Sequence, residues 1–468
     1  MAGREPGDRP NIVLINCDDL GYGDLGCYGS TVNRTPVLDR MSSEGVRFTD
    51  FYQASPLCSP SRGAMLTGCY PPRIGFGLFD GRGVLFPGMG VGLSGEERTV
   101  AEVLRERGYA TMLVGKWHCG DQPAFLPLQH GFDGYYGLPY SNDMGRQVGR
   151  TKPPPLPLIR DSEVVEEQPD QAALTERYVG RCREFIRANR DRPFFLYLAH
   201  MYVHLPIYVP ESFAARSMNG RYGAGVECVD WAAGAVLEEL KEQGLDGNTI
   251  VLFTSDNGSR VRGEGGSNGS LRGTKAQTWE GGMRVPLIAR WPGHVPAGME
   301  CREPVSGIDF LPTFAALAGA GAAVPADRPI DGRDISPLLL GEPGARSPHE
   351  ALYYYNGNSL DAVRMGRWKL FVGRGGNHTP GPRRELTELY DLGEDVGETT
   401  DVAGRHPEVV REIAALAEAC RVDLGDEARG VVGRNTRPIG RVENPRPLTV
   451  YDPSHAYFAA EYDLPDAG

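Results

Sequence analysis

Short apolar segments rich in β-branched and aromatic residues alternate along this chain with amphipathic segments, and this alternation limits the folds open to it. Buried strands are predicted at residues 11–16, 109–114, 194–200 and 249–254. Helices are predicted at residues 35–44, 99–107, 173–188 and 228–243. Strands that alternate with helices are typical of α/β proteins, in which helices cover both faces of the sheet. We therefore predict an α/β fold built on a large mixed sheet flanked by helices.

The character of the sequence changes after residue 340. A polar connector with proline and glycine (GEPGARSPHE) precedes several short strand-like segments and a helix near residues 407–420. Short strands separated by turn residues indicate a small antiparallel sheet, on which this helix would pack. At 468 residues, the chain is also too long for one ordinary domain. We predict a large domain over residues 1–340, and a small C-terminal α+β subdomain with its tail over residues 341–468.

The chain is acidic, with 49 Lys and Arg residues against 61 Asp and Glu residues and a net charge of −12. An acidic protein binds the phosphate backbone poorly, so we expect no nucleic-acid partner. The first apolar segment is too short to span a bilayer, and the residues before it lack the apolar run typical of an export leader. We therefore expect no membrane partner, and a cytoplasmic location unless a leader was removed. The nine cysteines lack CxxC or zinc spacing, so no disulfide framework is expected.

Acidic and amide side chains follow two of the predicted strands. Asp18 and Asp19 come after the first strand, and Asp256 and Asn257 come after the strand at residues 249–254. Open α/β sheets bind ligands at the carboxyl ends of their strands. Carboxylate and amide oxygens favour Ca²⁺ or Mg²⁺ over zinc. Acids after strands also serve as helix caps and turn formers, so neither pair alone establishes a metal site.

Two further segments carry reactive side chains. CSPSR (residues 58–62) places Cys58 near Arg62 at a predicted helix start, as an activated thiolate or as a buried structural cysteine. GYATMLVGKWH (residues 108–118) places Lys116 and His118 after a strand, which offers a fixed cation and a group that titrates near neutral pH. A surface lysine and a packed histidine would ordinarily explain the second segment. Its occurrence together with CSPSR favours a functional site.

The chain resembles the type I, formylglycine-dependent sulfatases, in particular the arylsulfatase A and N-acetylgalactosamine-6-sulfatase branch. CSPSR matches the CxPxR maturation signature of the family, and GKWH ends its second signature. Four more segments follow in the family's order: PYSND (139–143), HLP (204–206), SDNG (255–258) and LRGTKAQTWEGG (271–282). The resemblance implies an alkaline phosphatase-like fold with residues 1–340 as the catalytic domain. It also implies hydrolysis of an aryl or carbohydrate sulfate monoester to an alcohol and inorganic sulfate.

The resemblance also implies a modification, a metal and a set of roles. A formylglycine-generating enzyme would oxidise Cys58 to formylglycine, an aldehyde whose hydrate supplies the attacking hydroxyl. The bound metal would be Ca²⁺, with Mg²⁺ possible. The implied metal ligands are Asp18, Asp19, Cys58, Asp256 and Asn257. The implied catalytic residues are Cys58, Arg62, Lys116, His118, His204 and Lys275. The implied substrate-binding residues are Ser141, Lys116, His204 and Lys275.

Within this set, His204 would protonate the departing alcohol, and His118 would take up a proton when sulfate is released. His200 lies four residues before His204, at the predicted end of a strand rather than on one helix face, and we interpret it as structural.

Two other functions fit parts of the same pattern. A phosphodiesterase or phosphonate monoester hydrolase of the same superfamily could use a similar cradle of metal and cations. GKWH and RGTKAQTWEGG favour the sulfatase. A non-catalytic sulfate-binding relative would keep the cradle and leave Cys58 unoxidised. The sequence does not distinguish an aryl, sugar or steroid sulfate as the substrate.

Overall fold

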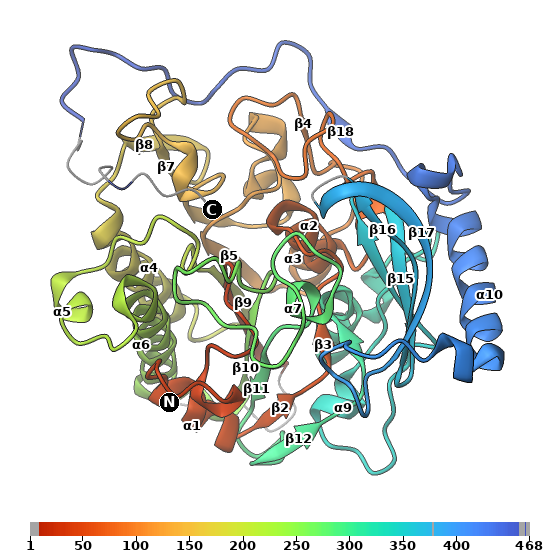
Figure 1. Cartoon of the computed structure of the whole chain (residues 1–468). Helices are drawn as coiled ribbons and strands as arrows, with labels where there is room; N and C mark the ends of the chain where they lie inside the picture. Colours follow the sequence, from red (N-terminus) through yellow and green to blue (C-terminus); the bar gives the residue numbers. More distant parts are fainter. Residues whose placement is uncertain (1–8, 377–378, 458–463, 465–468) are drawn as a thin grey trace.

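A ten-stranded sheet forms the centre of the molecule (Figure 1). The structure is a computed structural model that describes residues 9–376, 379–457 and 464. The strand order is β12-β2-β11-β10-β1-β9-β5-β6-β7-β8. These strands are β1 (Asn11–Cys17), β2 (Val46–Phe48), β5 (Ala110–Gly115), β6 (Gly134–Gly137), β7 (Pro157–Arg160), β8 (Glu163–Glu167), β9 (Phe194–Ala199), β10 (Thr249–Ser255), β11 (Leu287–Arg290) and β12 (Met299–Cys301). β10, β1, β9 and β5 run parallel, and antiparallel pairs lie on both sides, so the predicted mixed sheet is confirmed.

Helices cover both faces of this sheet because successive strand residues point to opposite sides. Along β1, Ile12 and Leu14 pack into one core, and Val13 and Ile15 pack into the other. The helices of the large sheet are α1 (Pro36–Ser43), α2 (Cys58–Thr67), α3 (Val100–Arg105), α4 (Leu174–Ala188), α5 (Glu211–Ala214), α6 (Gly220–Glu242), α7 (Glu280–Met283), α8 (Phe310–Leu317) and α9 (Ser336–Leu339). The first core includes side chains of α2, α3 and α8, and the second includes side chains of α1, α4 and α6.

The predicted start of α6 at residue 228 is wrong, because the helix begins at Gly220. Glycine lowers helix propensity, and the run GRYGAG contains three glycines, so the pattern favoured a loop. In the folded chain a Cβ at Gly225 would lie only 3.2 Å from the Ile207 side chain. The absence of a side chain therefore lets α6 pack closely against the loop that contains His204.

The C-terminal part forms the predicted antiparallel sheet with a helix. Its strands are β14 (Leu352–Asn356), β15 (Ser359–Met365), β16 (Trp368–Gly376) and β17 (Thr379–Asp391), in sequence order. Helix α10 (Pro407–Leu424) packs on this sheet through apolar residues spaced three and four apart: Ile413, Ala417, Cys420 and Leu424. Figure 1 shows α10 on the outer side of these strands. The boundary at residues 340 and 341 stays a prediction.

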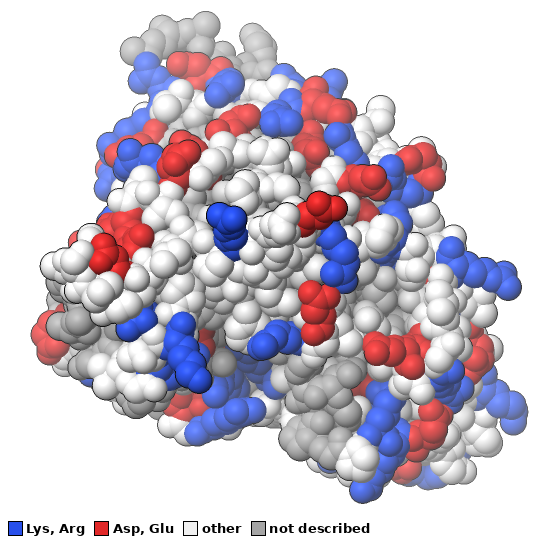
Figure 2. All heavy atoms as spheres, turned by 90° about the horizontal axis from the view of Figure 1, so that it is seen from above, with Lys and Arg blue, Asp and Glu red and all other residues white. Residues whose placement is uncertain are grey.

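The end of the chain returns to the large domain. β18 (Gly440–Arg441) pairs with β4 (Val91–Gly92), far from it in sequence. Within the described ranges, no helix combines the length and apolar character needed to cross a membrane. On the face seen in Figure 2, Lys and Arg side chains lie interspersed with Asp and Glu side chains, and neither sign covers that face alone.

Candidate active site

The carboxyl ends of β1 and β10 bring four of the predicted residues together. The two strands are parallel neighbours with Cys17 opposite Ser255, so the residues that follow them meet at one edge. The Asp19 backbone N–H donates to Asp256 Oδ1 (3.2 Å), and Asn257 Nδ2 donates to Asp19 Oδ1 (2.7 Å). All four side chains of this edge, including Asp18, are buried. The acid pairs predicted separately therefore form one cluster.

Helix α2 adds a cysteine and an arginine to this cluster. Cys58 is the first residue of α2, and its Sγ donates to Asp18 Oδ1 (3.4 Å). Residues four apart lie on the same helix face, so Arg62 reaches the same acids. Its Nε donates to Asp256 Oδ2 (2.9 Å), and its Nη2 lies 3.5 Å from Asp18 Oδ2. The spacing of CSPSR thus places both side chains against the ends of β1 and β10.

Two lysines complete the ion pairs of the cluster. Lys116, directly after β5, donates through Nζ to Asp18 Oδ2 and to Ser141 Oγ, the latter at 2.7 Å. Lys275 Nζ donates to Asp19 Oδ2 (2.8 Å). Each lysine therefore contacts one of the two adjacent acids, and Ser141 joins the site through Lys116.

Backbone and amide oxygens orient the two predicted catalytic histidines. His204 Nδ1 lies 2.7 Å from the Leu205 carbonyl and 3.2 Å from Asn142 Oδ1. His118 Nε2 lies 2.9 Å from the Leu85 carbonyl, to which it donates, so its Nδ1 is the acceptor. In the described part of the chain this Nδ1 has no hydrogen-bond partner. The sequence analysis missed Asn142, although this residue lies within PYSND. It could not identify the Leu85 carbonyl, because any residue type has a backbone carbonyl.

His200 lies apart from the cluster, in the core. Its Nδ1 accepts from the Tyr202 backbone N–H (3.0 Å), and its Nε2 lies 3.2 Å from Thr175 Oγ1. Burial lowers its pKa to about 3. Both ring nitrogens are thus used inside the fold, which agrees with a structural role.

Burial and neighbouring charges set the protonation states of the site. Burial alone would raise the pKa of Asp18, but Lys116, His204 and Arg62 hold it below its ordinary value. Burial, followed by the Asp18 carboxylate, raises the pKa of Cys58 well above its usual range. Burial and Lys116 lower the pKa of His118. At neutral pH, Asp18 is therefore ionised, Cys58 is a thiol and His118 is neutral.

The charges of the cluster balance before any ligand is added. Its three carboxylates belong to Asp18, Asp19 and Asp256, and its three cations are Arg62, Lys116 and Lys275. The site is therefore locally neutral, whereas the whole chain carries −12. A divalent cation would give the site an excess of two positive charges, the sign that an anionic substrate requires.

The donor set fits such a cation. Ligand atoms of Asp18, Asp19, Cys58 and Asp256 lie within 4.8 Å of one another. Asn257 Oδ1 is buried and has no hydrogen-bond partner among the described residues. A buried amide oxygen without a partner costs free energy, and a cation at this position would offset that cost. Carboxylate and amide oxygens are ligands that Ca²⁺ and Mg²⁺ prefer.

Comparison with known proteins agrees with this chemistry. The chain matches the family described as Sulfatase over residues 10–320, and the C-terminal region of aryl-sulfatase over residues 347–437. It is 41% identical to arylsulfatase A of Homo sapiens, over 89% of this chain and 88% of that protein. It is 40% identical to N-acetylgalactosamine-6-sulfatase of Rattus norvegicus, over 83% of this chain and 80% of that protein.

A solved structure shares the fold across both parts of the chain. The crystal structure of Ps i-CgsB in complex with k-i-k-neocarrahexaose superposes with a TM-score of 0.76 at 31% identity, covering 88% of this chain and 92% of that chain. The expected alkaline phosphatase-like architecture and the resemblance to arylsulfatase A and N-acetylgalactosamine-6-sulfatase are confirmed. The chain belongs to the sulfatase family, whose members typically use a metal ion and formylglycine, and it is an enzyme that hydrolyses sulfate esters.

Proposed function

We propose that this sulfatase acts on an aryl or carbohydrate sulfate through a formylglycine made from Cys58, with Ca²⁺ held by the cluster. The position of Cys58 carries the proposal. It begins α2, is buried, and contacts Asp18 within the group of possible metal ligands. Its raised pKa opposes the alternative of a thiolate nucleophile, because a buried thiol beside a carboxylate stays protonated. Oxidation to an aldehyde gives the same position a reactive group.

Formylglycine at position 58, once hydrated, would supply the hydroxyl that attacks the sulfur of the ester. Bound Ca²⁺ would be held by Asp18, Asp19, the residue at Cys58, Asp256 and Asn257, and it would lower the pKa of a coordinated hydroxyl and attract the anionic ester. The protein's own cations supply the remaining electrostatic stabilisation, which acts strongly in a buried site.

Each remaining residue has a role that its contacts support. Lys116 and Ser141 lie 2.7 Å apart, and with Lys275 they bind the sulfate oxygens. Arg62 stabilises negative charge beside Cys58. His204 Nδ1 lies against the oxygens of Leu205 and Asn142 and so carries a hydrogen. Nε2 therefore has a proton only in the doubly protonated ring, and in that form it donates this proton to the departing alcohol. His118 accepts a proton at Nδ1 when sulfate leaves, because its Nε2 is held by Leu85.

Mass spectrometry of the peptide that contains Cys58, from protein made in its native host, tests this proposal. We expect the –CH₂SH group to be replaced by –CHO, and we expect the same sample to hydrolyse an aryl sulfate repeatedly. An unmodified thiol in protein that binds but does not turn over sulfate esters would support the non-catalytic relative. Faster turnover of an aryl phosphate diester than of the aryl sulfate would support the phosphodiesterase.

Removal of divalent cations is expected to lower both activity and thermal stability. A ligand that binds only the folded state raises Tm with its concentration. After chelation and dialysis, added Ca²⁺ should restore Tm and aryl sulfate hydrolysis at lower concentration than Mg²⁺, since Ca²⁺ accepts an irregular all-oxygen ligand set more readily. Asp256→Asn is the control, and it should weaken the response to both cations. Full activity in the chelated enzyme would contradict the proposed metal.

A further inference from the structure

The segment of residues 271–282, called here the Lys275 segment, is tied to the site on one side. The Lys275 backbone N–H donates to the Ser259 carbonyl (3.0 Å), just after SDNG. The Ala276 backbone N–H donates to the Pro56 carbonyl (3.0 Å), just before CSPSR. Lys275 Nζ also donates to Asp19. Together these contacts hold the segment against the acids of the site, the SDNG loop and the start of α2.

The C-terminal sheet holds the other side of the Lys275 segment. Lys369 of β16 is fully buried, and its Nζ contacts three oxygens. They are the Thr278 carbonyl (2.9 Å), Glu280 Oε1 (3.0 Å) and Glu398 Oε1 (2.8 Å). The contacts with Thr278 and Glu280 are hydrogen bonds, and the contact with Glu398 is an ion pair. Two of these oxygens belong to the Lys275 segment itself.

Further contacts from the C-terminal subdomain reach the segment before and after Lys275. Arg272 Nη1 donates to the Glu398 carbonyl (2.6 Å), and the Glu280 backbone N–H donates to Glu398 Oε2 (2.8 Å). Thr278 Oγ1 donates to Asp361 Oδ2 (2.7 Å) of β15. The subdomain therefore restrains the backbone on both sides of Lys275.

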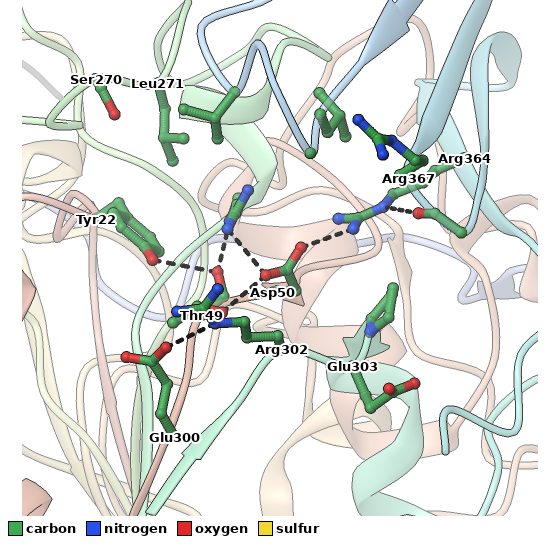
Figure 3. Close-up of a pocket in the computed structure, with 16 residues that line it drawn as sticks. Tyr22, Thr49, Asp50, Ser270, Leu271, Glu300, Arg302, Glu303, Arg364 and Arg367 are labelled. Carbon is green, nitrogen blue, oxygen red and sulfur yellow. Dashed lines mark hydrogen bonds and ion pairs between the residues drawn. The ribbon is translucent and has the colours of Figure 1, made fainter.

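Figure 3 shows the neighbouring part of the same junction, beside a pocket of about 580 Å³. Arg364 of β15 donates to Asp50 Oδ1 (2.7 Å). Asp50 is the residue directly before β3 (Phe51–Tyr52). Leu271, the first residue of the Lys275 segment, lines this pocket. Asp50 and Arg364 both line this pocket, and their ion pair links the C-terminal sheet to the chain between β2 and β3.

We propose that Lys369 is a positioning residue for Lys275. From the C-terminal sheet it fixes the Thr278 carbonyl and the Glu280 carboxylate, and so sets where the Lys275 ammonium lies relative to Asp19 and the sulfate. This inference rests on the role proposed above for Lys275. A small displacement of a group that binds the transition state can lower the rate a hundredfold, so a residue outside the site can control activity by position alone.

The test compares Lys369→Met with the matched variant Arg421→Met. Arg421 also forms a buried ion pair in the C-terminal subdomain, with Asp426 (2.9 Å). Among the described residues its ion-pair partners are Glu418 and Asp426, and neither belongs to the Lys275 segment. Each variant leaves a buried carboxylate without its cation, so both should unfold at lower urea concentration. At a temperature where both are folded, and after normalisation to formylglycine content, only Lys369→Met should lower kcat/KM, by at least about tenfold.

Two further measurements separate positioning from general destabilisation. Lys369→Arg keeps the charge and should recover part of the lost kcat/KM. Lys369→Met should also raise KM and weaken inhibition by inorganic sulfate, because Lys275 binds the sulfate group before the reaction.

Should Lys369→Met fail to fold, Thr278→Val removes the bond to Asp361 without removing a charge, and the same changes are expected on a smaller scale. Unchanged kinetics in the folded variants, or equal losses in Arg421→Met, would overturn the inference.

Lys275→Ala in the same assay separates this inference from the proposed function. If Lys275→Ala leaves kcat/KM unchanged, the role of Lys275 fails together with the inference. If Lys275→Ala lowers kcat/KM but Lys369→Met does not, only the positioning role of Lys369 is overturned.

Discussion

A Cys58→Ser variant is expected to release at most one alcohol molecule per enzyme molecule. A serine hydroxyl at this position still faces Asp18 and Arg62, so it can attack the sulfur once while the alcohol leaves. The resulting serine sulfate has no second hydroxyl on the same carbon through which sulfate could be expelled. The enzyme would therefore stay blocked after the first reaction, whereas binding of the ester by the cations would remain.

A burst assay with an aryl sulfate measures this directly. We expect a single release of phenol that does not exceed the enzyme concentration, and a peptide that carries one added sulfate at the introduced serine. Cys58→Ala is the control, because it keeps the cations but lacks any nucleophile, and it should bind without a burst. Sustained turnover by Cys58→Ser, with its peptide shown to be unmodified serine before substrate is added, would rule out the proposed nucleophile.

Replacement of Lys116 by methionine is expected to lower kcat/KM by about a thousandfold, the upper range for the loss of one preorganised donor. Lys116 is buried between Asp18 and Ser141, and the variant would leave the site with one cation fewer. The charge of the acidic cluster would then oppose the approach of an anion. Steady-state kinetics with an aryl sulfate, after normalisation to formylglycine content, measure the loss.

Ser141→Ala is the matched control for Lys116→Met, because it removes the other partner of the same contact without removing charge. Ser141→Ala removes one hydrogen-bonding group and keeps all three cations of the site, so we expect a loss of only about tenfold. Lys116→Met should also unfold more easily, since Asp18 loses a buried counter-ion. Equal effects of the two variants on kcat/KM would contradict the argument that Lys116 acts through its charge.

Much of the site follows from the regular geometry of strands and helices. Asp18 and Asp256 lie close together because β1 and β10 are parallel neighbours, and Cys58 and Arg62 contact the same acidic cluster because they lie one helical turn apart. The helical spacing of Cys58 and Arg62 can be predicted from a short stretch of sequence, whereas the pairing of β1 with β10 joins segments far apart in the chain. Four of the ten strands of the central sheet, β1, β5, β9 and β10, are predicted from apolar runs of the right length.

Other parts could not be predicted, because they depend on packing between distant segments. The start of α6 was missed because Gly225 is favoured by close contact with Ile207 rather than by helix propensity. The Leu85 carbonyl, which orients His118, belongs to a loop whose position depends on the folded chain. Lys369 lies outside every recognised segment, and only the folded C-terminal sheet places it beside Glu280.

All ten residues of α2 are buried, and Cys58 itself is 1% exposed. Another protein cannot reach this side chain once the sheet has closed around it. If Cys58 is oxidised as proposed, the reaction has to be complete before β10 pairs with β1 and the site closes around α2. Because residues 68–248 separate α2 from β10, a long stretch of chain is made after Cys58 and before the site can close.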